Sequence, residues 1–582
     1  MKKIISIALC SCAIALTGCE DMFEPSFENT MDIDAIHKNP NYAENFLANA
    51  YTRLPGYAWN DPATDDCVSN DAGNSFRRMA AGTWTSSDNP IDAWSNSRSA
   101  IQYINMFLQH ADQVEWAQDP IAKAMYCDRF KGEAYALRAL FTYYMLRAHA
   151  GKTADGELLG VPILTEPENA TSNFNQPRKT FIECVNAIKE DAQKALELLP
   201  LDYSNTANSA LASKYPGANN SHVVRVFGQV FAGRISGRIV EALLAQVELM
   251  AASPAYQASG VTWESAANAA GKVLDRINGV NGIDPTGWHW FINGDDIKNL
   301  TDGMNVPEMI WRSEKDNANS LEKNNFPPTL YGSGRINPTQ NLVDAFPMAN
   351  GYPISRQESN YDPADPYTGR DPRLTTYILC NGKQAGTANE TIHTSVDGNT
   401  NDGLNVVSTS TRTGFYLKKF LRQDVNCNPS NESTQPHYTA RIRYTEIFLD
   451  YAEAANEAWG PTGSGSHSYS AYDVIKALRQ RAGVGVDNGD PYLESVKGNK
   501  DAMRELIRNE RRLELCFEGF RFWDLRRWNA NLNETAKGVK ITGNNHEVID
   551  VDTRNFKDFM IYGPIPNSEI LKYSELKQNA GW

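Results

Sequence analysis

The feature that most limits how this 582-residue chain can fold is the recurrence of apolar side chains at every third or fourth position. An α-helix turns once in 3.6 residues, so this spacing places the side chains on one helical face. The clearest sets are Ala134, Leu137, Phe141, Tyr144 and Ala148; Ile239, Leu243, Val247 and Met250; and Tyr444, Phe448, Tyr451 and Ala455. Each set predicts a long helix with one buried face.

Further helices are expected at residues 93–113, 263–278, 468–482 and 499–517. Thr180 and Glu183 predict a capping box at the start of another helix, which runs to Leu199 and must stop at Pro200. The expected helices are long, come in pairs, and carry alanine at inward positions. These properties favour a mostly α fold with a tetratricopeptide-like helical-repeat scaffold. Because the strict repeat consensus is absent, we expect irregular helix pairs wrapped by other structure.

The pattern changes between residues 281 and 428, where Gly, Pro, Asn, Asp and Thr interrupt the chain at short intervals. Short β-like runs occur there, such as 309–311 and 377–379. We therefore expect a loop-rich insertion with short strands, mounted on the helical scaffold. Binding specificity usually resides in loops held by a rigid body, so this insertion is the expected binding region.

The N-terminus has the pattern of a lipoprotein signal peptide. Two lysines precede an apolar run, residues 4–16, which is too short to cross a bilayer. The run ends in Leu-Thr-Gly-Cys at 16–19, the sequence of a bacterial lipobox. Residues 1–18 are therefore expected to be removed, and Cys19 to carry the lipid. Residues 19–40 are the expected lipidated N-terminus and tether.

The charge balance disfavours nucleic acid as a partner. Without residues 1–18 the chain carries 54 basic and 70 acidic side chains, whereas a phosphate backbone requires a basic surface. The cysteines that remain after the lipid-modified one are widely spaced, with no C-x-x-C pair, which disfavours a zinc or iron–sulfur site. Cys184 and Cys516 lie on helical apolar faces and are expected in the core, while any disulfide pairing stays open.

Several segments resemble landmarks of the SusD/RagB family, and they occur in that family's order. They are DAWSNSRSAIQYINMFL at 92–108, KGEAYALRALFTYYMLRAHAG at 131–151, GVPIL at 160–164, INPTQNLVDAF at 336–346, DPRL at 371–374, GFYLKKF at 414–420 and IRYTEIFLDYAEAANEA at 442–458. The most specific is RNERRLELCFEGFRFWDLRRW at 508–528, and the chain closes on LKQNAGW. The resemblance covers nearly the whole chain after the lipobox.

This resemblance implies a SusD-like α-α superhelix, with a helical region at 41–280 and the RagB/SusD region at 281–582. It implies a cell-surface lipoprotein, anchored in the outer membrane and facing outward, that binds a polysaccharide or oligosaccharide. Its implied partner is a SusC-like TonB-dependent transporter, and no enzymatic activity is expected. Three alternatives stay open: a RagB-like protein that binds peptides, a surface glycoside hydrolase, and a purely structural lid for the transporter.

Glu510, Glu514 and Glu518 recur every four residues within the signature segment and invite comparison with a glycosidase carboxylate pair. The same segment contains Arg508, Arg511, Arg512, Arg521, Arg526 and Arg527. Arginine neighbours hold carboxylates ionised, whereas a general acid needs a raised pKa. We therefore predict a structural network of ion pairs here. The sequence also has no H-E-x-x-H, G-x-S-x-G or P-loop motif.

The predicted glycan-binding residues are mainly aromatic, because the C–H faces of sugars stack on rings while nearby polar groups bond the hydroxyls. They are Trp84, Trp288, Trp290, Trp311, Asp65, Asp66, Tyr331 and Arg335. If residues 288–291 are extended, both tryptophans of that run share one face. Trp94, Trp523 and Trp528 lie within family motifs and are expected in the core.

No cofactor is expected. Asn360, Asp362, Asp365 and Asp371 offer oxygen ligands of the kind that calcium prefers, but Asp-Pro turns explain the same residues.

Overall fold

The computed structural model describes residues 33–582, apart from 58, 207–208 and 302. The predicted signal peptide, Cys19 and most of the tether lie outside the described residues. Within the described part of the chain, no helix is long and apolar enough to cross a membrane.

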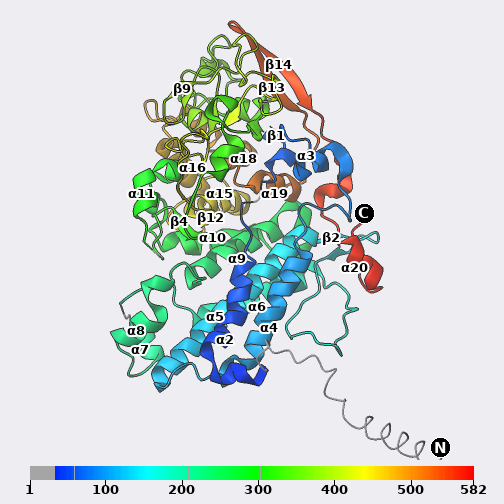
Figure 1. Ribbon diagram of the computed structural model, residues 1–582, viewed down its shortest axis with the longest axis vertical. Helices are drawn as coiled ribbons and strands as arrows, with labels where there is room; N and C mark the ends of the chain where they lie inside the picture. Colours follow the sequence, from blue (N-terminus) through cyan, green and yellow to red (C-terminus); the bar gives the residue numbers. More distant parts are fainter. Residues whose placement is uncertain (1–32, 58, 207–208, 302) are drawn as a thin grey trace, which may run out of the picture.

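A stack of long helices forms one half of the molecule (Figure 1). Its members are α2 (Pro40–Thr52), α4 (Trp94–His110), α5 (Pro120–His149), α6 (Phe181–Leu198), α9 (Gly237–Ala252) and α10 (Trp263–Asp275). Each packs against the next helix in this series. Such stacking of successive helices is the arrangement of a helical-repeat scaffold, which confirms the predicted fold class.

The stack continues across the loop-rich segment. Helix α15 (Tyr444–Trp459) packs directly on α10 although the whole insertion separates them in sequence. Helices α16 (Ala471–Arg481) and α18 (Lys500–Glu514) then pack on α15. The insertion therefore leaves the helical stack after α10 and returns to the same layer at α15.

The local signals for helix ends are also confirmed. The Thr180 hydroxyl accepts a hydrogen bond from the Glu183 amide, and the Glu183 carboxylate accepts one from the Thr180 amide. Helix α6 begins directly after this capping box, and Pro200 follows its end. The shorter helices are α3 (Ser75–Arg78), α7 (Ser209–Lys214), α8 (Asn220–Phe227), α11 (Gly294–Asn299), α12 (Ser320–Asn325), α13 (Gln340–Ala345), α14 (Arg373–Tyr377), α17 (Pro491–Val496), α19 (Phe520–Arg527) and α20 (Asn567–Lys572).

The strands of the described residues are short and pair two by two, always antiparallel. The pairs are β1 (Cys67–Ser69) with β6 (Ile336–Pro338), β2 (Gly151–Lys152) with β3 (Leu158–Leu159), β4 (Met309–Arg312) with β12 (Ala440–Arg443), β5 (Asp316–Ala318) with β11 (Gln435–His437), β7 (Ile378–Leu379) with β10 (Tyr416–Leu417), β8 (Gln384–Ala385) with β9 (Glu390–Thr391), and β13 (Ala536–Thr542) with β14 (Asn545–Asp552). Each pair joins two segments of the chain by backbone hydrogen bonds.

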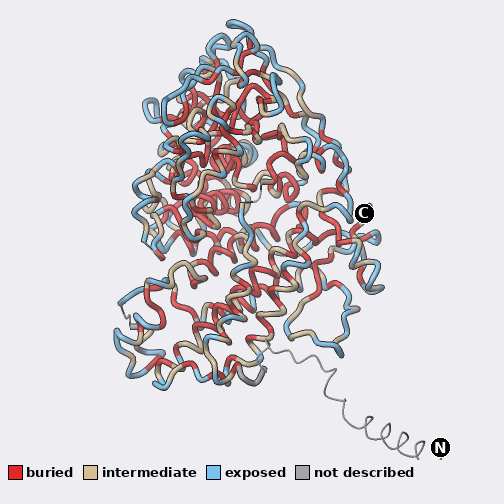
Figure 2. The backbone as a smooth tube through the Cα atoms, in the orientation of Figure 1, coloured by how far each residue is buried: buried red, intermediate tan, exposed pale blue. Residues whose placement is uncertain are grey.

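The main apolar core runs along the helical stack, and a second core lies under the loop-rich half (Figure 2). Cys184 and Cys516 are buried, as expected from their helical positions. The scaffold below the loops is thus a packed body, which gives the loops a fixed support.

Candidate functional site

The ladder between β1 and β6 joins two of the segments that carry predicted binding residues. Its register pairs Cys67 with Pro338 and Ser69 with Ile336. Just beyond it, the Asn70 amide donates to the Arg335 carbonyl at 3.3 Å, and the Asn70 side chain donates to the Ser333 carbonyl at 2.9 Å. Residues 65–78 and 331–335 therefore meet on one face of the loop-rich half.

We define this loop face by Asn70, Arg77, Tyr331, Arg335, Arg412 and Asp552. Asp552, at the end of β14, accepts two hydrogen bonds from the Arg412 guanidinium at 2.7 and 2.8 Å. Arg77 approaches the same carboxylate at 3.8 Å. Burial raises the pKa of Asp552, but the hydrogen bonds and charge of Arg412 outweigh it and hold that pKa low. The two guanidiniums share one carboxylate, which leaves N–H groups for a ligand.

Tyr331 is the exposed aromatic ring of the loop face. Its side chain is 55% exposed, and its backbone is left-handed, with φ of 63°. The Asn428 side-chain amide donates a hydrogen bond to its hydroxyl at 3.1 Å. A ring that is exposed yet held at its tip has the properties of a stacking platform for a sugar.

Trp84, in contrast, lies in the core. It is 3% exposed, its indole N–H bonds the Asn89 side chain at 2.9 Å, and its ring meets the Trp582 ring edge-on at 4.6 Å. Phe522 and Phe556 also pack near it. The prediction of an exposed platform at Trp84 is wrong, because the C-terminal residue and α19 cover a segment whose composition looked like a surface loop.

The Trp288–Phe291 run is a 3-10 helix, Gly287–Ile292, and not the extended segment that would align both tryptophans. Trp290 is buried and stacks on Tyr438 at 4.9 Å, so it is a core residue and not a platform. Trp288 is half-buried against the second core, with its carbonyl accepting a hydrogen bond from the Tyr377 hydroxyl at 2.5 Å. Neither ring joins the loop face.

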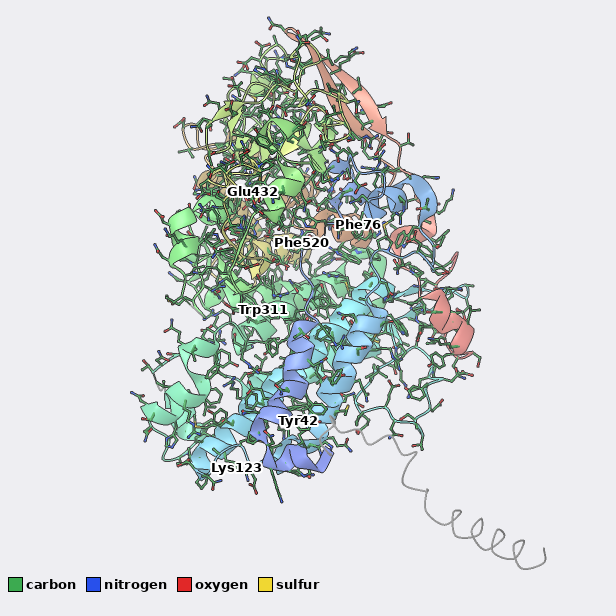
Figure 3. The ribbon with its side chains drawn as sticks, viewed as in Figure 1. Tyr42, Phe76, Lys123, Trp311, Glu432 and Phe520 are labelled. Atoms are coloured by element: carbon green, nitrogen blue, oxygen red, sulfur yellow. The ribbon has the colours of Figure 1, made fainter. Side chains whose placement is uncertain are left out.

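Trp311 lies on β4 at mid-height of the molecule (Figure 3). It is 2% exposed, its indole N–H donates to the Gly233 carbonyl at 3.1 Å, and the Arg441 guanidinium lies 5.4 Å from its ring. It contributes an edge to a cleft of ≈ 540 Å³ that is also lined by Arg234. The structure therefore makes Trp311 a buried wall of a cleft, and the expected open platform is absent.

Asp65 and Asp66 are buried and ion-paired, which corrects their predicted role in bonding sugar hydroxyls. Asp65 binds Arg512 and Arg521 at 2.9 and 2.8 Å, and Asp66 binds Arg512 at 2.6 Å. These bonds tie β1 to α18 and α19. The two carboxylates hold the scaffold under the loop face instead of facing a ligand.

The possible calcium ligands do not form a cluster. Asp371 is buried and paired with Arg373 at 2.7 Å, while Asp362 and Asp365 bond groups of their own turns. In the described part of the chain, no group of three or more His, Cys, Asp or Glu side chains is arranged to hold a metal ion.

The carboxylates of the signature segment form the predicted ion-pair network, with partners from other elements. Glu510 and Glu514 are both fully buried. The Arg373 guanidinium lies between them, bonding Glu510 at 2.5 Å and Glu514 at 2.9 Å, and Arg481 bonds Glu514 at 2.8 Å. Burial raises the pKa of Glu514, but Arg481, Arg443 and Arg373 hold it well below its usual range. Such a carboxylate cannot serve as a general acid.

Trp523 is a residue whose role the sequence did not reveal, because its motif marks it as core. It is half-buried, and the Arg147 guanidinium lies 4.7 Å from its ring. It borders two adjoining cavities between the helical and loop-rich halves, which also share Arg147, Gln246 and Phe520; Figure 3 shows Phe520 at this level. We call them the outer cavity (≈ 140 Å³) and the inner chamber (≈ 50 Å³).

Comparisons with known proteins agree on one family. The model described as "SusD family" matches residues 307–582, and the model described as "Starch-binding associating with outer membrane" matches residues 38–216. SusD-like protein P38 of Formosa agariphila is 22% identical over 571 residues, which cover 93% of this chain and 94% of that protein.

Solved structures show the same fold. A SusD-like protein of Bacteroides fragilis is 23% identical, with a TM-score of 0.70 over 95% of this chain and 99% of that one. A laminarin-binding SusD-like protein is 19% identical, with a TM-score of 0.55 over 94% of this chain and 100% of that one. The helical stack and the loop-rich half are therefore shared with proteins of this kind.

Proposed function

Because this chain belongs to the SusD family, we propose that it is a cell-surface lipoprotein that binds a glycan and passes it to a SusC-like TonB-dependent transporter of the outer membrane. The glycan binds on the loop face. Tyr331 stacks on a sugar ring, while Asn70, Arg335, Arg77 and Arg412 bond its hydroxyls. The lipid on Cys19 keeps the protein at the membrane.

The observation that carries this proposal is the meeting of three segments distant in sequence, one of which also carries an exposed ring. Asn70 follows β1, Arg335 precedes β6 with Tyr331 in the same loop, and Asp552 ends β14. A fixed polar set, with an open aromatic ring on one of the same loops, suits an uncharged, hydroxyl-rich ligand. The name of the laminarin-binding relative supports a glycan as the ligand class.

Two alternative functions are less well supported. A hydrolase needs accessible carboxylates, whereas Glu510 and Glu514 are fully buried among arginines. A peptide-binding protein would use an exposed β-strand edge or an apolar groove. The loop face instead offers one exposed ring and polar side chains, which favours a glycan.

The test is an affinity-gel screen of plant, fungal and host polysaccharides, laminarin and starch included, followed by calorimetry on Tyr331→Ala. We expect the wild type to bind at least one polysaccharide and the variant to bind it about 5- to 30-fold more weakly, the loss of about 1–2 kcal/mol of stacking. Thermal stability should hardly change, since the ring is mostly exposed before binding.

Phe174→Ala is the matched control, because Phe174 is an exposed ring in the loop before α6, away from the loop face. It should bind like the wild type. Equal affinity of wild type and Tyr331→Ala would remove the loop face as the binding site. If no glycan binds and the protein binds unfolded or short peptides instead, the peptide alternative is favoured.

A further inference from the structure

The inner chamber contains a buried arginine with almost no partners. Arg526, on α19, is 3% exposed and lines the chamber. Its Nη1 donates to the Phe522 carbonyl at 3.1 Å, while its Nε and Nη2 have no hydrogen-bond partner among the described residues. The rings of Phe522, Phe556 and Trp84 surround the guanidinium at 3.5 to 5.3 Å. Buried cations are normally paired, so this arrangement requires an explanation.

Two other buried arginines that lack a carboxylate partner donate several hydrogen bonds to backbone carbonyls. Arg178 donates to the carbonyls of Gly160, Leu159, His149 and Lys577. Arg370 similarly donates to three carbonyls, those of Pro366, Val343 and Phe346. Arg526 differs because it lines the chamber and two of its three guanidinium nitrogens have no hydrogen-bond partner among the described residues.

A second cation borders the same chamber. The Arg147 guanidinium lies 4.7 Å from the Trp523 ring, and its Nε also lacks a hydrogen-bond partner among the described residues. Tyr143 and Tyr256 add hydroxyl groups to the lining. Burial lowers the pKa of Arg526 to about 9, which still leaves the guanidinium charged at neutral pH. Two arginine and two tyrosine side chains thus line one space.

The acids of the chamber do not neutralise these two arginines. Asp450 binds Arg511 at 2.6 Å, and Asp524 binds Arg511 and Arg527 at 2.8 Å. Glu446 accepts a hydrogen bond from Gln246 at 2.5 Å, and burial together with the Asp450 charge raises the pKa of Glu446. Its neutral form is favoured, so it repels an anion little.

The dimensions limit what the chamber can hold. A volume of ≈ 50 Å³, against about 10–15 Å³ for one water molecule, accepts a group of a few heavy atoms. A sugar ring does not fit there, but the adjoining outer cavity of ≈ 140 Å³ is larger. Arg147 and Trp523 belong to both cavities, so a group attached to a ring in the outer cavity can reach the inner chamber.

We propose that the inner chamber binds the anionic group, a carboxylate or a sulfate, of an acidic sugar residue, with Arg526 and Arg147 as its ligands. The part of this inference that concerns a sugar rests on the proposed function; the anion site itself does not. A planar guanidinium bonds such oxyanions in a bidentate manner, and burial strengthens the attraction.

The anion site is tested with sodium sulfate alone, at millimolar concentration and with ionic strength held constant by sodium chloride. We expect sulfate to raise the melting temperature of the wild type along a saturable curve, because it binds only the folded state. Arg526→Gln should lose about tenfold or more of the affinity for sulfate, since charge-assisted hydrogen bonds are removed. Without sulfate this variant should melt at or above the wild-type temperature, because an unpaired buried charge has been removed.

Arg554→Gln is the matched control. Arg554 is also buried and carboxylate-free within the described residues, but it donates to the carbonyls of Thr64 and Cys67 and does not line the chamber. Its variant should keep the full sulfate response. Arg526→Lys should retain part of it, and Arg147→Gln, changed at the half-buried rim, should weaken it as well. An equal sulfate response in the wild type, Arg526→Gln and Arg147→Gln would overturn the site.

The source of the anion is tested with oligogalacturonides against their neutral methyl esters, and with a sulfated galactan oligosaccharide against its desulfated form. Preference of the wild type for one charged form, lost in Arg526→Gln, supports an acidic sugar. Equal binding of charged and neutral forms overturns the acidic-sugar inference while leaving glycan capture intact. A sulfate response without binding of any sugar supports the anion site and contradicts the proposed function.

Discussion

The Arg335 guanidinium donates a hydrogen bond to the Asn70 side-chain oxygen at 3.4 Å, although the two residues are 265 positions apart in the chain. Asn70 in turn donates to the carbonyls of Ser333 and Ser410. One amide side chain therefore fixes two loops of the loop face relative to β1. Its role is to position the binding residues, and this can be measured.

Asn70→Ala should weaken glycan binding about 5- to 10-fold while reducing the free energy of unfolding by only about 1 kcal/mol. The reason is that the loops that carry Tyr331 and Arg335 lose a common support. Calorimetry and urea denaturation measure the two effects. Asn96→Ala, which removes a similar bond to the Arg53 carbonyl in the helical half, should leave affinity unchanged. Equal affinity of both variants would contradict the positioning role.

Trp84→Ala should reduce the free energy of unfolding by about 3–5 kcal/mol, because it leaves a large cavity among packed rings. Its folded fraction should still bind glycan with wild-type affinity, since the ring is not exposed. Chemical denaturation gives the first quantity and calorimetry below the melting temperature gives the second. If the variant melts like the wild type but loses binding, Trp84 contacts the glycan and is not a core residue.

Glu514→Gln should reduce the free energy of unfolding by about 3–5 kcal/mol, because the buried carboxylate loses its ion pairs with Arg373, Arg443 and Arg481. Glu505→Gln is the control: the Glu505 side chain is exposed where it pairs with Arg508, so the change should be within about 0.5 kcal/mol. Urea denaturation measures both. If Glu514→Gln is as stable as the wild type but loses a polysaccharide hydrolysis that the wild type shows, Glu514 is instead catalytic.

Asp61 should make stability depend on pH. Both of its carboxylate oxygens are buried without a hydrogen-bond partner among the described residues. Burial, and then the Asp66 charge, raise the pKa of Asp61 to about 7, above its value in the unfolded chain. The stability that it contributes is therefore present at low pH and is lost as pH rises through about 7.

Asp61→Asn keeps the shape of the side chain without the charge. The variant should be more stable than the wild type at pH 8, by up to about 4 kcal/mol, and the difference should shrink toward pH 5. Urea denaturation of both proteins at several pH values measures this. Parallel pH profiles for the two proteins would show that Asp61 does not titrate in this range.

Cys19→Ala should abolish display at the cell surface while leaving the protein folded, because the lipid is the proposed membrane attachment. Surface labelling of intact cells and a melting curve of the purified protein check both parts. Surface labelling of the variant at the wild-type level would contradict a lipid anchor at Cys19.

The long helices could be predicted from the sequence because they depend on local patterns. The capping box of Thr180 and Glu183 and the apolar face of α15 involve residues within a few turns of one another. The family motifs gave the fold class in the same way. These signals do not depend on which distant segments meet.

The partners of buried charges could not be predicted, because they are set by tertiary contacts. Glu510 and Glu514 were expected to pair with the arginines of their own segment, but they bind Arg373 and Arg481 from other elements. The predicted exposure of the tryptophan side chains was wrong for a similar reason. Trp84 is surrounded in sequence by small polar residues, yet Trp582, almost 500 positions later, covers its ring.

The direct packing of α15 on α10 means that the loop-rich segment begins and ends at neighbouring points of a rigid stack. Changes of length or sequence between those points alter the closure entropy of the segment only slightly, because it grows with the logarithm of loop length. The helices need not move to accommodate them. One scaffold can therefore carry many different recognition surfaces, and ligand choice can diverge between relatives faster than their architecture does.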